Sequence, residues 1–70
     1  MMMNEARTYT IRTRTRLTGI TRTSGQATGT RHSEAFFWIC KEARKLSSTG
    51  RYDKVEVIDK ATKETIATIL

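Results

Sequence analysis

An alternating stretch from Tyr9 to Thr18, reading Tyr-Thr-Ile-Arg-Thr-Arg-Thr-Arg-Leu-Thr, constrains the fold more than any other feature of the chain. Side chains of an extended strand point alternately to its two faces. One face of this predicted strand carries the apolar side chains and two threonines: Tyr9, Ile11, Thr13, Thr15 and Leu17. The other face carries, besides Thr10 and Thr18, the residues that we call the arginine ladder: Arg12, Arg14 and Arg16. Because β-branched residues favour extended backbone, we expect a strand with its apolar face on a core.

Turn and cap signals divide the rest of the chain. Gly19 allows a turn after the first strand, and Ser33 is a good N-cap for a helix that Gly50 would follow. Residues 25–30 are turn-like and fit either a bulged strand end or a loop. The expected elements are strands at about 7–18, 20–24, 54–59 and 64–70 and a helix at 34–47.

These elements predict an α+β fold in the order ββαββ. One helix covers one face of a four-stranded sheet, antiparallel or mixed, and leaves the other face open. We expect residues 1–6 to be disordered and residues 7–70 to form a single domain, since 70 residues are near the lower limit for one hydrophobic core. The helical spacing predicts that Phe36, Ile39, Cys40, Ala43 and Leu46 face that core.

The chain is basic, and its charge is uneven. The formal net charge is +6. Residues 1–33 contain six arginines against the single acid Glu5, whereas residues 34–70 contain seven basic and six acidic residues. Arginine suits bidentate contact with phosphate or carboxylate. A nucleic acid, an anionic membrane surface or an acidic protein would each suit such a half-chain.

Cysteine usage and the start of the chain bear on its compartment. Cys40 is the only cysteine, so no intramolecular disulfide can form. The start lacks the apolar stretch of a secretory signal, and no run approaches membrane-spanning length. Residues 1–33 have the Arg, Thr and Ser content of a transit peptide, but their pattern has the period of a strand instead of a helix. We expect a cytoplasmic protein without a membrane partner.

The whole pattern resembles small uncharacterised bacterial and phage proteins in which two hairpins surround one helix. The resemblance covers about residues 8–69 and rests on Tyr9-Thr-Ile-Arg-Thr, on Ser33-Glu-Ala at the helix start and on the closing hairpin. Such proteins commonly have Thr-Gly in the final turn, where this chain has Thr62-Lys63. The resemblance implies a fold, and it carries no functional residue to this chain.

The arginine ladder has two interpretations. Neighbouring charges about 6.8 Å apart repel only weakly in water, so a solvated ladder that protects a sheet edge needs no ligand. Alternatively, the ladder makes an anion-binding face, with Arg22 and Arg31 contributing if they lie on the same side.

The aromatic pair Phe37 and Trp38 has three interpretations, one of which is that Trp38 stacks on a nucleic-acid base, although sheet aromatics usually do so. Trp38 falls on the helix side shared by Lys41, Glu42 and Lys45. The two rings can cover the end of a short core, or they can anchor a protein interface, where tryptophan is enriched.

Catalytic and metal chemistry find little support. The Gly25–Thr30 segment has three residues between its glycines and Thr30 where a phosphate-binding loop needs lysine. His32 and Cys40 are about 12 Å apart along a helix, too far for a nucleophile and its base. One cysteine and one histidine are too few for a metal site. Glu34 and Glu42 are two helical turns apart, so the helix does not support catalysis by paired carboxylates. We expect no enzyme, no metal and no cofactor.

The leading prediction is a non-catalytic module that contacts nucleic-acid phosphates through the basic sheet face. Its expected contacts are Arg12, Arg14, Arg16, Arg22 and Arg31. The alternative is a protein-interaction module, bacterial or from a phage or mobile element, that uses Phe37 and Trp38 or a free sheet edge. The small core and surplus aromatics also predict a homodimer.

Overall fold

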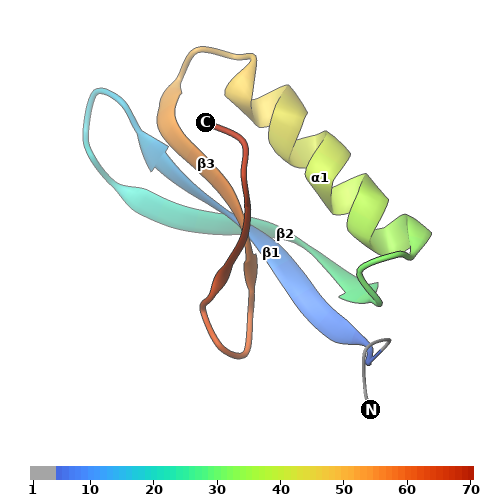
Figure 1. Cartoon of the computed structure of the whole chain (residues 1–70). Coiled ribbons are helices and arrows are strands. Elements are labelled where there is room, and N and C mark those ends of the chain that lie inside the picture. Colours follow the sequence, from blue (N-terminus) through green and yellow to red (C-terminus); the bar gives the residue numbers. More distant parts are fainter. Residues whose placement is uncertain (1–4) are drawn as a thin grey trace.

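The computed structural model describes residues 5–70, which form two β-hairpins and one helix (Figure 1). The elements follow in the order β1 (Arg7–Thr15), β2 (Thr21–Gly29), α1 (Glu34–Ser47), β3 (Tyr52–Asp59) and β4 (Thr65–Thr68). The strand order across the sheet is β2-β1-β3-β4, and every neighbouring pair is antiparallel. The predicted ββαββ fold is confirmed. The disorder expected for residues 1–6 falls mainly on residues 1–4, outside the described residues.

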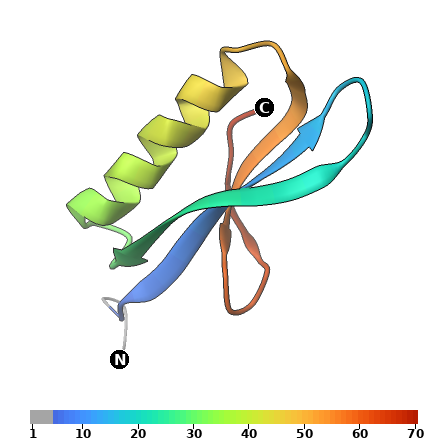
Figure 2. The same cartoon turned by 180° about the vertical axis from the view of Figure 1, so that it is seen from behind.

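The helix begins and ends where its capping residues predict. The Ser33 hydroxyl accepts a hydrogen bond from the Phe36 backbone amide at 3.3 Å, which satisfies one of the amides left unpaired at a helix start. Gly50 takes a φ of +78° shortly after the last turn. The helix crosses one face of the sheet, and in the two opposite views residues 5–70 place no second layer on the other face (Figures 1 and 2).

The core lies between α1 and the sheet. Tyr9 and Ile39 are fully buried, and the Tyr9 ring meets the Phe36 ring edge-on with 4.9 Å between their centres. Phe36 and Leu46 are only half-buried, because they sit at the margins of the helix stripe. The buried core residues are Tyr9, Ile11, Ala27, Ile39, Cys40, Ala43, Val55 and Val57. The predicted core face of the first strand is therefore confirmed at Tyr9 and Ile11.

The first hairpin turns earlier than its alternation predicts. β1 ends at Thr15, whose carbonyl accepts the Gly19 amide at 2.7 Å and whose amide donates to the Ile20 carbonyl at 2.9 Å. Gly19 takes a φ of +72°, a value that disfavours other residues. The prediction that Leu17 lies on the core face is wrong: Leu17 is in the turn and 94% exposed.

A β-bulge extends the second strand. Tyr9 pairs with Ala27 and Ile11 with Ser24, so β2 has one more residue than β1 over this interval. Gly25 has a φ of +71°, and an added Cβ would lie 3.3 Å from Ile39 Cδ1. The buried Thr10 hydroxyl donates to the Gly25 carbonyl at 2.7 Å. Of the two interpretations of residues 25–30, the bulged strand end is correct as far as Gly29.

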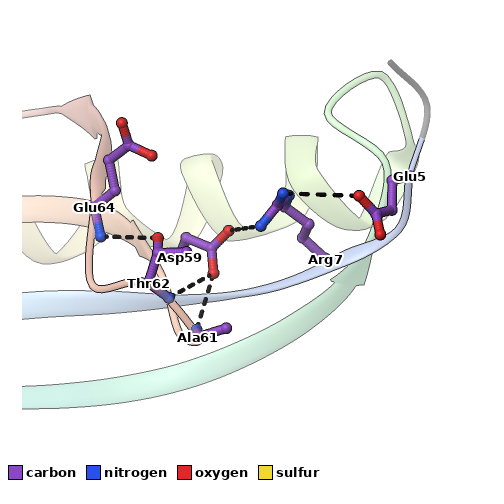
Figure 3. A network of polar contacts seen from close by, with 6 residues as sticks. All are labelled: Glu5, Arg7, Asp59, Ala61, Thr62 and Glu64. Atoms are coloured by element: carbon purple, nitrogen blue, oxygen red, sulfur yellow. Dashed lines mark hydrogen bonds and ion pairs between the residues drawn. The ribbon is translucent and has the colours of Figure 1, made fainter. Parts of the chain in front are cut away.

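A polar network joins β1 to the turn after β3 (Figure 3). Asp59 accepts the Ala61 amide at 2.9 Å and the Thr62 amide at 3.3 Å through Oδ1. Arg7 donates to the other carboxylate oxygen of Asp59 at 3.0 Å and lies 3.7 Å from Glu5. Asp59 is 2% exposed, so these donors replace the water that burial removes.

This network sets the ionisation of Asp59. Burial raises the pKa of the carboxyl, but the Thr62 and Ala61 amides and Arg7 outweigh burial and hold its pKa below the usual value. A carboxyl whose pKa is lower in the folded state stabilises that state above its unfolded pKa, about 3.9. The stabilisation is lost as the pH falls through the lower, folded-state pKa.

We therefore expect Asp59→Asn to lower the thermal unfolding midpoint at pH 7. The difference from wild type should begin to shrink below about pH 4, where the unfolded carboxyl takes up a proton, and should shrink further at the lower folded-state pKa, where the native carboxyl becomes neutral as well. Thermal unfolding followed by circular dichroism between pH 7 and pH 2 measures both effects, with the exposed Glu64→Gln as the control. A difference that is independent of pH would contradict the assigned role of Asp59.

Candidate anion-binding surface

Two members of the arginine ladder, Arg12 and Arg14, lie on the sheet face away from α1, as the alternation predicts. Arg12 and Arg14 flank Thr13, which is 6% exposed and pairs with Val55 on the core side. Their guanidinium groups are held by carboxylates of β3. Arg12 lies 2.8 Å from Glu56, and Arg14 Nε donates to Asp53 at 2.8 Å. Two of the three ladder charges are therefore balanced within the sheet.

The Arg14–Asp53 contact also shifts the pKa of both side chains. The hydrogen bond to Asp53 and its charge raise the pKa of Arg14, and the hydrogen bond from Arg14 lowers the pKa of Asp53. An incoming phosphate would have to compete with a carboxylate already in place. This geometry favours the interpretation of Arg12 and Arg14 as cross-strand partners that fix the register of β1 and β3.

The remaining predicted cations do not join this face. Arg16 follows the end of β1 and donates to the Tyr52 carbonyl at 3.3 Å. Arg22 pairs in register with Thr13, so it lies on the same sheet face as α1. Arg31 lies before the helix with its guanidinium carbon 5.7 Å from the centre of the Phe36 ring. The five predicted arginines thus do not form one surface.

A hollow of about 500 Å³ lies on the helix side of the sheet, near the turn of the first hairpin. The helix does not cover this part of β2, and every residue from Thr21 to Gln26 is exposed. The hollow is lined by Thr13, Thr15, Thr18, Ile20, Arg22, Thr23, Ser24, Arg51 and Tyr52. It combines two guanidinium groups, several hydroxyls and one aromatic ring in a concave surface.

Arg51 is a candidate site residue that the sequence does not predict. It lies in the loop between α1 and β3, at the same end of the molecule as the first hairpin's turn (Figures 1 and 2). Its carbonyl accepts the Arg16 amide at 2.9 Å, which ties the two segments together. Arg51 also lines a second hollow of about 500 Å³, beside Arg16 and Leu17. We call this end of the molecule, with Arg16, Arg22 and Arg51, the hairpin-end surface.

In the described part of the chain, the arginines of the hairpin-end surface are not paired with carboxylates, although the charge of Arg16 contributes, after the hydrogen bond from Arg14, to the lowered pKa of the nearby Asp53. Within residues 5–70, the ion pairs of the protein involve Arg7, Arg12, Arg14 and Lys45. None of the three arginines of the hairpin-end surface takes part in them. Guanidinium groups without a carboxylate partner keep their donors available for an external anion.

Another hollow, of about 460 Å³, opens on the face away from α1 and includes Lys60 and Lys63. Lys60 Nζ donates to the Gln26 side-chain oxygen at 2.8 Å. Lysine offers a point charge and not the planar fork that matches a phosphate. The hairpin-end surface is therefore the better candidate of the two for binding an anion.

The aromatic pair is exposed on α1. Phe37 is 65% exposed and Trp38 is 46% exposed, so neither ring is enclosed by the core. This finding favours the interface interpretation over the covering of a core end.

The two residues considered for nucleophilic catalysis, Cys40 and His32, lie on α1 and just before it. Cys40 is buried against the core, and burial raises the pKa of its thiol. His32 and Cys40 border one shallow hollow together with Arg31, Phe36 and Arg44. Among the residues described, no three His, Cys, Asp or Glu side chains are grouped to hold a metal ion. Over the same residues, no helix is long and apolar enough to cross a membrane.

Comparison with protein-family models, curated proteins and solved structures gives no match to this chain.

Proposed function

We propose that the protein is a non-catalytic module that binds nucleic-acid phosphates at the hairpin-end surface. The observation that carries the proposal is the position of Arg22 and Arg51 in one hollow, without an ion pair to either within the described chain. Each guanidinium can donate two parallel hydrogen bonds to a phosphate. Thr13, Thr15 and Thr18 add hydroxyl donors around them.

The net charge supports the same proposal. A formal charge of +6 attracts polyanions over a distance, and the ion pairs of Arg12 and Arg14 leave the free positive charge elsewhere on the surface. Contacts of this kind position a protein on a phosphate backbone without reading bases. We therefore expect an affinity that depends little on nucleotide sequence and strongly on salt.

The direct test is a binding titration with duplex DNA, single-stranded DNA and RNA at 50 mM and 200 mM salt. If three phosphates of a duplex are neutralised, a plot of log affinity against log salt concentration has a slope of about −2.7, which is a roughly 40-fold loss of affinity over this range. Fluorescence anisotropy of labelled 20-mers of two unrelated sequences measures how the affinity depends on salt and on nucleotide sequence. Absence of binding to all three nucleic acids at 50 mM salt would refute the proposal.

A second candidate function, protein interaction, is favoured by the exposure of Phe37 and Trp38. The two candidates predict opposite sensitivities. Phosphate binding should depend on Arg22 and Arg51 and be indifferent to Trp38, whereas a protein contact through α1 should depend on Trp38.

A further inference from the structure

The face of α1 that points away from the core has an unusual composition. Ile39 and Ala43 face the sheet and are fully buried, whereas Phe37 and Trp38 stand exposed on the other side. Exposed apolar patches are a feature of interaction surfaces, and tryptophan is enriched among the residues that contribute most to binding at interfaces. We define the aromatic helix face by its exposed residues Glu34, Phe37, Trp38, Lys41 and Lys45.

The aromatic helix face carries a negative charge at the start of α1 and a positive charge at its end. Glu34 lies in the first turn of α1 and Lys45 in the last, about 16 Å apart along the axis. Glu34 has no ion pair within residues 5–70, and Lys45 has only an exposed contact at 3.3 Å with Glu42 on its own helix. A partner helix with basic charge opposite Glu34 and acidic charge opposite Lys45 would complement this face.

A second copy of α1 running in the opposite direction has that charge pattern. Glu34 and Lys45 lie symmetrically about the midpoint between Ile39 and Cys40, and Trp38 and Lys41 lie symmetrically about the same midpoint. One two-fold axis therefore places Glu34 opposite Lys45 and Trp38 opposite Lys41 at the same time. A parallel arrangement would instead bring like charges together at both ends.

We propose that the protein forms a two-fold symmetric dimer through the aromatic helix face, with the two α1 helices antiparallel. Each Trp38 ring packs on the aliphatic stem and ammonium group of Lys41 from the second copy. Two Glu34–Lys45 pairs close the ends, and the opposed helix dipoles add to the attraction. This interface lies on α1 and is separate from the hairpin-end surface, so it stands independently of phosphate binding.

Net charge determines the conditions for the measurement. Two copies with a formal charge of +6 repel each other, and about 0.15 M salt shortens the range of that repulsion to roughly 8 Å. At this salt we expect wild type to dimerise in the micromolar to high-micromolar range, as measured by sedimentation equilibrium. Trp38 is the only tryptophan, so its emission should shift to shorter wavelength with rising concentration.

Charge reversal tests the antiparallel arrangement. Glu34→Lys and Lys45→Glu each replace two attractive pairs with two repulsive ones, and each should weaken dimerisation at least about tenfold. A mixture of the two variants restores both attractive pairs and should dimerise as wild type does. Glu64→Lys makes the same charge change as Glu34→Lys in an exposed turn, and it should leave dimerisation unchanged.

Three outcomes would overturn the proposal. They are a wild type that stays monomeric at several hundred micromolar, single variants that dimerise as wild type does, and a mixture that remains monomeric. Far-UV circular dichroism of each variant at low concentration shows that its fold is intact, since the exchanged residues are exposed and lie outside the core.

Discussion

Replacement of Ile39 by alanine is expected to reduce the free energy of unfolding by about 2–5 kcal/mol. Ile39 is fully buried, and its Cδ1 atom packs close to the Gly25 bulge and the core. The smaller alanine side chain would lose apolar contacts and leave a cavity between α1 and the first hairpin. A domain of 70 residues has few kcal/mol to lose, so the variant should be largely unfolded at 37 °C.

Urea unfolding at 25 °C measures this effect, and Ile20→Ala is the matched control. Ile20 is the same residue type but is 47% exposed at the hairpin end, so its replacement should change stability by less than about 1 kcal/mol. A folded Ile39→Ala protein with an unchanged unfolding midpoint would contradict the placement of α1 on the sheet.

The largest effect on binding is expected from Arg22→Gln combined with Arg51→Gln. Both side chains are exposed, so the double variant should fold as wild type does. Loss of two charge-assisted phosphate contacts should weaken binding roughly 30- to 100-fold at 50 mM salt. The slope of the salt dependence should flatten by about two units on a duplex.

Two control variants distinguish a defined phosphate site from a general effect of net charge. Lys41→Gln with Arg44→Gln removes the same number of exposed charges from α1, and it should change affinity only a few-fold. Arg14→Gln should affect stability more than binding, because Arg14 is held by Asp53. Equal losses of affinity in all of these variants would point to net charge alone and contradict a defined phosphate site.

Local signals in the sequence were sufficient for much of the fold. The cap at Ser33 and the buried stripe of α1 depend on residues close together in the chain, and both were predicted. The sequence also predicts the turn at Gly19, but it does not predict the length of that turn. The turn begins after Thr15, so β1 is shorter than expected. The exposure of Leu17 is the consequence.

The site residues depend on pairings between distant segments, which local patterns do not determine. Glu56 meets Arg12 from 44 residues away, and Asp53 meets Arg14 from 39 residues away. The alternation of β1 indicated which face the ladder occupies and gave no information on the carboxylates that β3 brings to it. Arg51 was missed for the same reason, because its place beside Arg22 follows from the pairing of β1 with β3.

The claim that phosphates bind at the hairpin end and not along the ladder can be tested residue by residue with nuclear magnetic resonance. Titration of the ¹⁵N-labelled protein with an unlabelled oligonucleotide reports each backbone amide separately. The largest shifts are expected at residues 15–24 and 49–52, around Arg22 and Arg51. Shifts concentrated on Arg12, Arg14 and their partners in β3, with the hairpin end unaffected, would contradict the claim.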